Sequence, residues 1–197
     1  MKIISKPMGD YGTNCYIIEI NANQIIIDPG VDAFDWVVKN AKNPVAILNT
    51  HGHFDHVWSN AIIAKHFNIP IYCPKDDAFM LLNDPFGQQT PKSTPTFKVS
   101  PNETIQLLDT DIIFHHFAGH TPGCSAIEIA GNLFSGDFIF QGSIGRVDFP
   151  FSSKEDMKKS LLKVLSFKKD FVIYPGHGNK TTLANERASL KGWLNYL

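Results

Sequence analysis

The feature that most constrains this chain is a run of four residues of metal-ligating types within six positions. The run directly follows residues 44–49, an apolar stretch typical of a strand buried on both faces. Alternate residues of an extended chain project to the same side, and a turn after Phe54 would bring the last residue back towards the others. A loop of ordinary hydrogen-bonded histidines is the alternative, but imidazole and carboxylate groups at this density favour a metal site. The four residues are His51, His53, Asp55 and His56.

Three further ligand candidates stand where predicted strands or turns end. His120 lies in the stretch 119–123, Asp137 follows Gly136, and His177 lies between Gly176 and Gly178. Flanking glycines let the backbone approach a site closely. A simple turn would explain any one of these positions, but together they would supply ligands from other strands to enclose a metal.

The hydrophobic pattern predicts one domain over residues 1–197, with sheets and helices outside them. The pattern alone does not decide between a parallel sheet and a sandwich. Residues 84–96 hold three prolines and predict a long surface loop. The predicted strands are 13–20, 24–28, 44–49, 69–73, 103–108, 112–117, 126–129, 132–134 and 171–174. The predicted helices are 33–41, 58–67, 76–82, 152–167 and 183–197.

Composition narrows the classes of partner. The net charge is −1, so no excess of basic residues favours a nucleic-acid role. No apolar run is long enough to predict a membrane-spanning helix or a secretory signal, so no membrane partner is expected. The three cysteines, Cys15, Cys73 and Cys124, show no pairing pattern, which favours a cytoplasmic protein. The sequence does not indicate the oligomeric state.

The motifs resemble those of the metallo-β-lactamase superfamily, and within it the glyoxalase II-like hydrolases. The resemblance runs from residues 14–16 through 28–30 to His177. It implies an α+β fold, the αββα sandwich, in which two sheets pack face to face with helices outside. It also implies two divalent metal ions. Zinc is the leading candidate, and iron or manganese would suit the same nitrogen and oxygen ligands.

The resemblance further implies a division of the ligands and a mechanism. His51, His53 and His120 would hold one metal; Asp55, His56 and His177 would hold the other; Asp137 would bridge both. A water between the two ions would lose a proton near neutral pH and attack an acyl carbon. One ion would stabilise the tetrahedral anion, and Asp55 would act as the catalytic residue that orients the attacking oxygen.

Two segments help to choose a branch of the family. True β-lactamases of this fold usually have Cys or Ser where this chain has Asp137, so antibiotic hydrolysis is not favoured. Residues 142–150 resemble the short bacterial glyoxalase II-like proteins and, nearly as well, the persulfide dioxygenases. Full-length glyoxalase II enzymes carry a C-terminal helical domain that grips glutathione, for which the residues after His177 leave no room. Within 142–150, Arg146 either meets a substrate carboxylate or pairs with Asp148 or Asp137.

These observations favour a binuclear metal-dependent hydrolase of a thioester or small acyl ester, with hydroxyacylglutathione as the leading substrate. The alternative is a mononuclear iron persulfide dioxygenase that would use His51, His53 or a neighbouring trio together with Asp137. The remaining histidines are expected to be structural or exposed at the surface. These are His66, His115 and His116.

Overall fold

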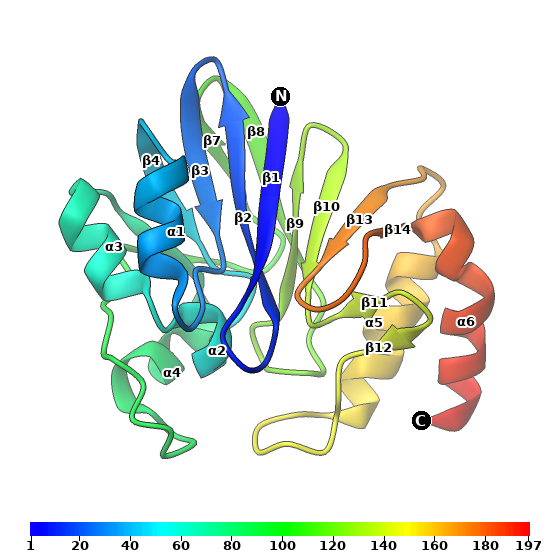
Figure 1. Cartoon of the computed structure of the whole chain (residues 1–197). Coiled ribbons are helices and arrows are strands. Elements are labelled where there is room, and N and C mark those ends of the chain that lie inside the picture. Colours follow the sequence, from blue (N-terminus) through cyan, green and yellow to red (C-terminus); the bar gives the residue numbers. More distant parts are fainter. The chain divides into compact units, whose positions relative to one another are not determined.

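The computed structural model describes all 197 residues, and the chain forms two compact units, residues 1–100 and 101–197 (Figure 1). Each unit is built on one six-stranded sheet with its own helices. The single domain over residues 1–197 stays a prediction.

The sheet of the first unit has the order β1-β2-β3-β4-β5-β6. The first three strands pair antiparallel, and β3 to β6 pair parallel, which places helices in the connections. The strands are β1 Lys2–Met8, β2 Thr13–Ile20, β3 Asn23–Ile27, β4 Pro44–Leu48, β5 Ile71–Pro74 and β6 Phe97–Val99. The helices are α1 Ala33–Asn40, α2 Phe54–Val57, α3 Asn60–Phe67 and α4 Ala78–Asn83, with a 3-10 turn, η1, at Lys75–Asp77.

One face of this sheet packs against α1 and α3. Val37 of α1 and Ile63 of α3 belong to the same buried cluster as Ile17, Ile26 and Ile47 of the sheet. Residues of the opposite parity are also buried, so the central strands are covered on both faces. This double burial explains why β4 appears in the sequence as a continuous apolar run rather than as an alternating one.

The sheet of the second unit has the order β14-β13-β10-β9-β8-β7. Its pairs are antiparallel except β10 with β13. The strands are β7 Thr104–Leu107, β8 Thr110–His116, β9 Ser125–Ile129, β10 Asn132–Gly136, β13 Val172–Pro175 and β14 Thr181–Thr182. A small hairpin, β11 Ile139–Phe140 with β12 Ser143–Ile144, follows β10. Helices α5 Lys154–Leu165 and α6 Leu183–Tyr196 contact each other and pack on a buried cluster that includes Leu161, Leu190 and Phe117 (Figure 1).

Helix α5 begins at a serine that caps it. The Ser153 side chain accepts a hydrogen bond from the Asp156 main-chain N–H at 3.1 Å, and acidic residues occupy the first turn. We expect Ser153→Ala to lower the free energy of unfolding by about 1 kcal/mol, because one helical N–H loses its acceptor. Ser153→Asp, which keeps an acceptor, should stay close to wild type. Urea unfolding followed by circular dichroism measures both, and equal stability of all three proteins would contradict the capping role.

The structure departs from the predicted elements at several places. Strands β6, β11, β12 and β14 were not predicted, because two or three residues are too few to show an alternating pattern. Strand β1 was not predicted, because its apolar residues do not alternate regularly with its lysine, serine and proline residues and only the partner strand β2 reveals its register. The extended arrangement predicted for His51 to Asp55 is wrong beyond His53, where the chain turns into α2. Residues 84–96 contain no helix or strand, as predicted. No helix has the length and apolar character needed to cross a membrane.

Candidate metal centre

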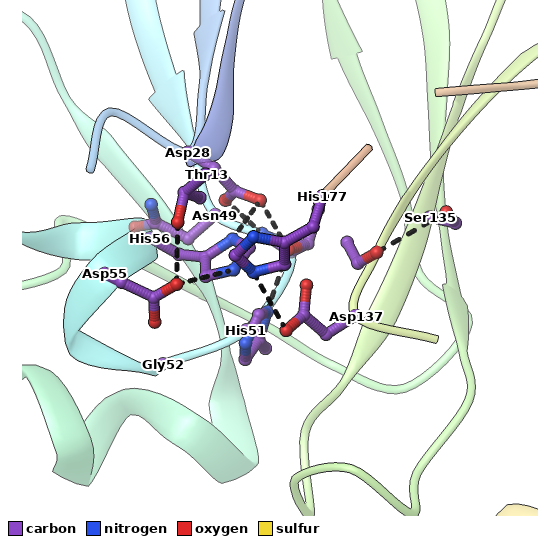
Figure 2. Close-up of polar contacts among 12 residues, drawn as sticks. Thr13, Asp28, Asn49, His51, Gly52, Asp55, His56, Ser135, Asp137 and His177 are labelled. Carbon is purple, nitrogen blue, oxygen red and sulfur yellow. Dashed lines mark hydrogen bonds and ion pairs between the residues drawn. The ribbon is translucent and has the colours of Figure 1, made fainter. Parts of the chain in front are cut away.

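The four ligand candidates of the first unit lie together where β4 ends and α2 begins. His51 is buried, and its ring centroid lies 4.1 Å from that of His56 and 4.9 Å from that of His53. Asp55 and His56 belong to the single turn of α2, with His56 Nε2 at 3.5 Å from Asp55 Oδ2. The helical turn therefore brings the run of sequence neighbours to one point, as Figure 2 shows for Asp55, His56 and His51.

The hydrogen bonds of Thr50 determine which nitrogen of His51 carries its proton. Thr50 Oγ1 lies 2.6 Å from Asp28 Oδ2 and 3.0 Å from His51 Nδ1. A carboxylate only accepts, so the single hydroxyl proton is donated to Asp28, and His51 Nδ1–H must donate to the hydroxyl oxygen. In the neutral imidazole, Nε2 of His51 then carries the lone pair, and this is the form that binds a metal.

Asp28 orients the His56 ring through a similar hydrogen bond to its Nδ1 atom. His56 Nδ1 lies 3.0 Å from Asp28 Oδ2, and Asp28 Oδ1 accepts from the Thr50 main-chain N–H at 2.8 Å. The carboxylate thus serves three donors while it is almost wholly buried. Asp28, His51 and His56 each have a ligating atom within 4.8 Å of the others, but these bonds fit Asp28 as the residue that orients the two histidines. Asp28 was not predicted as a site residue, because Asp28-Pro29-Gly30 is also an ordinary turn signal.

Two more side chains hold the first unit's ligand segment. Thr13 Oγ1 donates to Asp55 Oδ2 at 2.7 Å, as drawn in Figure 2, which orients the carboxylate predicted to be catalytic. The buried Asp77 accepts from the Gly52 main-chain N–H at 2.9 Å. A Cβ atom on Gly52 would lie 2.9 Å from the Asp77 carbonyl, so glycine is required for this approach.

In the second unit, one carboxylate oxygen faces two histidines. Asp137 directly follows β10, His120 lies in the loop between β8 and β9, and His177 follows β13. Asp137 Oδ2 lies 3.4 Å from Nε2 of His120 and 3.4 Å from Nε2 of His177. Figure 2 shows the contact between His177 and Asp137. The structure therefore brings together all three residues that the sequence predicts at these chain breaks.

The proton of His120 is also determined by its partner. His120 Nδ1 lies 2.8 Å from the main-chain carbonyl oxygen of Arg146, which only accepts. His120 must therefore carry a proton on Nδ1, and in the neutral imidazole its Nε2 lone pair lies on the side of Asp137.

The Arg146 side chain pairs with Asp148 rather than with Asp137. Its guanidinium donates from Nε and Nη2 to the two Asp148 oxygens at 2.9 and 2.8 Å and lies 4.3 Å from the Phe149 ring centroid. These hydrogen bonds lower the pKa of Asp148 and raise that of Arg146. Both side chains are more than half exposed, so this pair contributes little to stability.

The other singled-out residues lie outside the ligand sets. His115 pairs with Glu128 at 2.8 Å, His116 Nε2 lies 2.8 Å from the Pro122 carbonyl, and His66 is exposed. All three cysteines are free and buried, and burial raises the pKa of the Cys15 and Cys73 thiols.

The chemistry of the donor sets fits divalent metal ions. The first unit presents imidazole Nε2 atoms and a carboxylate from one short segment, and the second presents two Nε2 atoms around one carboxylate oxygen. For three of the histidines the Nδ1 partner leaves the Nε2 lone pair for a ligand: His51, His56 and His120. Such nitrogen and oxygen ligands suit zinc, iron and manganese.

Residues 8–177 match the family model of the metallo-β-lactamase superfamily, and the chain belongs to that family. The predicted fold class, the α+β fold of the metallo-β-lactamase superfamily, is confirmed by this match and by solved structures. The chain is similar to the crystal structure of the BLEG-1 B3 metallo-β-lactamase, with a TM-score of 0.84, 28% identity, and coverage of 95% of this chain and 97% of that one. The crystal structure of TTHA1623 in a di-iron-bound form gives a TM-score of 0.80, 29% identity, and coverage of 94% and 98%.

Among curated proteins, the chain is 34% identical to an uncharacterized protein of Aquifex aeolicus, over 92% of each chain. It is 31% identical to the hydroxyacylglutathione hydrolase GloC of Haemophilus influenzae, over 96% of each chain. The predicted resemblance to the metallo-β-lactamase superfamily and its hydroxyacylglutathione hydrolases is therefore confirmed at the level of similarity.

Proposed function

We propose that this protein is a binuclear metal-dependent hydrolase of a thioester or small acyl ester, with a hydroxyacylglutathione as the leading substrate. The observation that carries the proposal is the placement of Asp137 Oδ2 at 3.4 Å from Nε2 of both His120 and His177. A carboxylate oxygen between two imidazoles is suited to bridge two ions. In this arrangement each ion would keep further ligands from the chain.

The proposed division of ligands follows the one expected from the sequence. Asp137 would be shared, and the side chains of the other six residues would divide between the two ions. His51, His53 and His120 would hold one ion, and Asp55, His56 and His177 the other. When bound, two divalent ions would acidify a water molecule and polarise the acyl carbonyl of the substrate.

The chain's own residues would keep this site in the required protonation state. Asp28 and Thr50 hold the protons of His56 and His51 on Nδ1, so both Nε2 atoms remain ligands. Thr13 holds the Asp55 carboxylate, which would accept a hydrogen bond from the attacking water and orient it towards the acyl carbon. No nucleophilic side chain is needed in this scheme, so Cys124 and Ser125 have no proposed role.

The similar proteins support the substrate class and the number of metals. Haemophilus influenzae GloC is a hydroxyacylglutathione hydrolase, and TTHA1623 has been crystallised in a di-iron-bound form. BLEG-1, a B3 metallo-β-lactamase, supports β-lactam hydrolysis as a rival activity on the same fold. We propose a small-molecule substrate and a cytoplasmic location, with no nucleic-acid or membrane partner. The metal is proposed to be zinc, with iron or manganese as alternatives.

The test combines metal analysis with two substrates. Protein is purified without added metal, loaded with zinc, iron or manganese, and analysed for metal per chain. Each form is then assayed with S-lactoylglutathione and with a chromogenic cephalosporin. Two ions per chain with turnover of the thioester above the metal-free control supports the proposal.

Other outcomes overturn parts of the proposal. Turnover of the cephalosporin alone would replace the thioesterase by a β-lactamase. A single iron that cannot be raised to two, with oxygen uptake on glutathione persulfide, would replace the hydrolase by a persulfide dioxygenase. Two metals without turnover of S-lactoylglutathione would remove that substrate from the proposal.

A further inference from the structure

The segment after Asp137 folds back onto Asp137 itself. Strands β11 and β12 form a hairpin with Ile139 opposite Ile144, and Gly145 at its end donates its N–H to the Phe138 carbonyl at 3.4 Å. The return of the chain places Gly145 against Asp137 and Arg146 against His120. Asp137 thus lies against Gly145, and His120 lies against both Gly145 and the next residue, Arg146.

The approach of Gly145 to Asp137 excludes any side chain. A Cβ atom built on Gly145 would lie 1.8 Å from the Asp137 carbonyl oxygen and 3.1 Å from His120 Nδ1. Gly145 does not have a positive φ, so the requirement for glycine is one of space and not of backbone conformation. The hydrogen that takes the place of a side chain points at the carbonyl oxygen, which is the arrangement of a Cα–H···O contact.

The first unit repeats this contact at its own ligand aspartate. A Cβ atom on Gly30 would lie 1.9 Å from the Asp55 carbonyl oxygen, and Gly30 likewise does not have a positive φ. Ser59 holds Gly30 in place, because its hydroxyl donates to the Gly30 carbonyl at 2.6 Å. In both units, then, a glycine touches the main-chain carbonyl of an aspartate whose carboxylate is a proposed ligand.

The hairpin of the second unit is anchored at its tip as well as at its base. The buried Glu186 of α6 accepts from the Gly142 N–H at 2.8 Å and from the Thr181 hydroxyl at 2.6 Å. Trp193 donates to the Gly142 carbonyl at 3.5 Å. A hairpin held at both ends presents Gly145 and the Arg146 carbonyl at fixed positions.

We propose that Gly30 and Gly145 are positioning residues of the metal centre. Each glycine contacts the main-chain carbonyl of one proposed ligand aspartate and thereby sets where the carboxylate of that aspartate binds metal. The inference rests on the proposed function, because it takes Asp55 and Asp137 as ligands. The magnitude follows from geometry. A methyl group at either glycine must move the facing carbonyl by about 1 Å, whereas metal–ligand distances tolerate only about 0.2 Å.

The test compares Gly30→Ala and Gly145→Ala with Gly192→Ala, whose added Cβ would meet nothing within 4 Å and which also has no positive φ. Cobalt(II) is titrated into each metal-free protein in competition with a chromophoric chelator, and the visible ligand-field spectrum is recorded. Circular dichroism and urea unfolding of the metal-free proteins report folding separately. We expect each of the first two variants to bind at least one cobalt about 10–100-fold more weakly and with an altered spectrum. Gly192→Ala should match wild type in cobalt affinity and in the visible spectrum.

The outcomes separate the two proposals. If wild type binds two cobalt ions and both folded glycine variants match its affinity and spectrum, the positioning role of the two glycines is overturned and the proposed function stands. If wild type binds no cobalt, the proposed function is overturned, and the positioning role of the two glycines is overturned with it. Should one glycine variant fail to fold, the other decides, because the two glycines lie in different units.

Discussion

Asp137→Ala is expected to abolish the proposed pairing of two metal ions and, with it, the proposed hydrolytic activity. One carboxylate oxygen lies 3.4 Å from the Nε2 atoms of both His120 and His177, so its loss would leave neither of the two proposed ions with the shared ligand. Loss of an outer partner of a metal ligand costs about 10–100-fold in affinity or activity. Loss of the shared ligand itself should therefore lower kcat by more than about 10³-fold on the same scale.

The measurement is metal content per chain together with kcat on the thioester that wild type hydrolyses. Asp35→Ala, at an exposed position of α1, is the matched control and should keep two ions and full activity. An Asp137→Ala protein that retains two tightly bound ions and more than a tenth of the activity would show that the carboxylate is not a bridging ligand.

Asp28→Asn is expected to damage the metal site without removing any proposed ligand. The amide has nearly the shape of the carboxylate, but its NH₂ group would face two donors, the Thr50 hydroxyl and the His56 Nδ1–H. The favoured response is a change of the histidine tautomer, which moves a proton onto the ligating nitrogen. We expect metal affinity to fall about 10–100-fold. The free energy of unfolding of the metal-free protein should fall by about 2 kcal/mol, because buried donors lose their acceptor.

Isotope-edited NMR of the imidazole nitrogens distinguishes this account from a general loss of structure. In wild type, His51 and His56 should carry their protons on Nδ1, and in Asp28→Asn the population with Nε2–H should rise. Asp35→Asn is the control of the same chemical type at an exposed position. Unchanged tautomers with unchanged metal affinity would show that Asp28 does not orient these histidines.

The grouping of the proposed ligands could be predicted from the sequence because each of them is a histidine or an aspartate at or near the end of a predicted strand or turn. Residues His51 to His56 are contiguous, and His120 and His177 each lie next to a glycine. Strand β4 and helix α5 could be predicted for a related reason: double burial and a serine cap each leave a local pattern. What these elements share is that the physical cause lies within a few residues of its effect.

The residues that position the ligands could not be predicted in the same way. Asp28 meets Thr50 and His56 only in the folded chain, and Thr13 meets Asp55 across 42 residues. Strand β1 was missed because its pairing with β2 supplies the order that its own sequence lacks. The sequence indicated a substrate contact or an ion pair for the Arg146 side chain, but it gave no sign that the Arg146 main-chain carbonyl accepts a hydrogen bond from His120.

At position 146 the main chain and the side chain have different roles. The group that fixes His120 is a peptide carbonyl, which every amino acid supplies, while the guanidinium extends outward to Asp148 and solvent. Mutations at position 146 can therefore alter charge, size and reach at the surface while the bond to His120 is retained. A saturation library at this position is therefore expected to keep the hydrogen bond that orients His120.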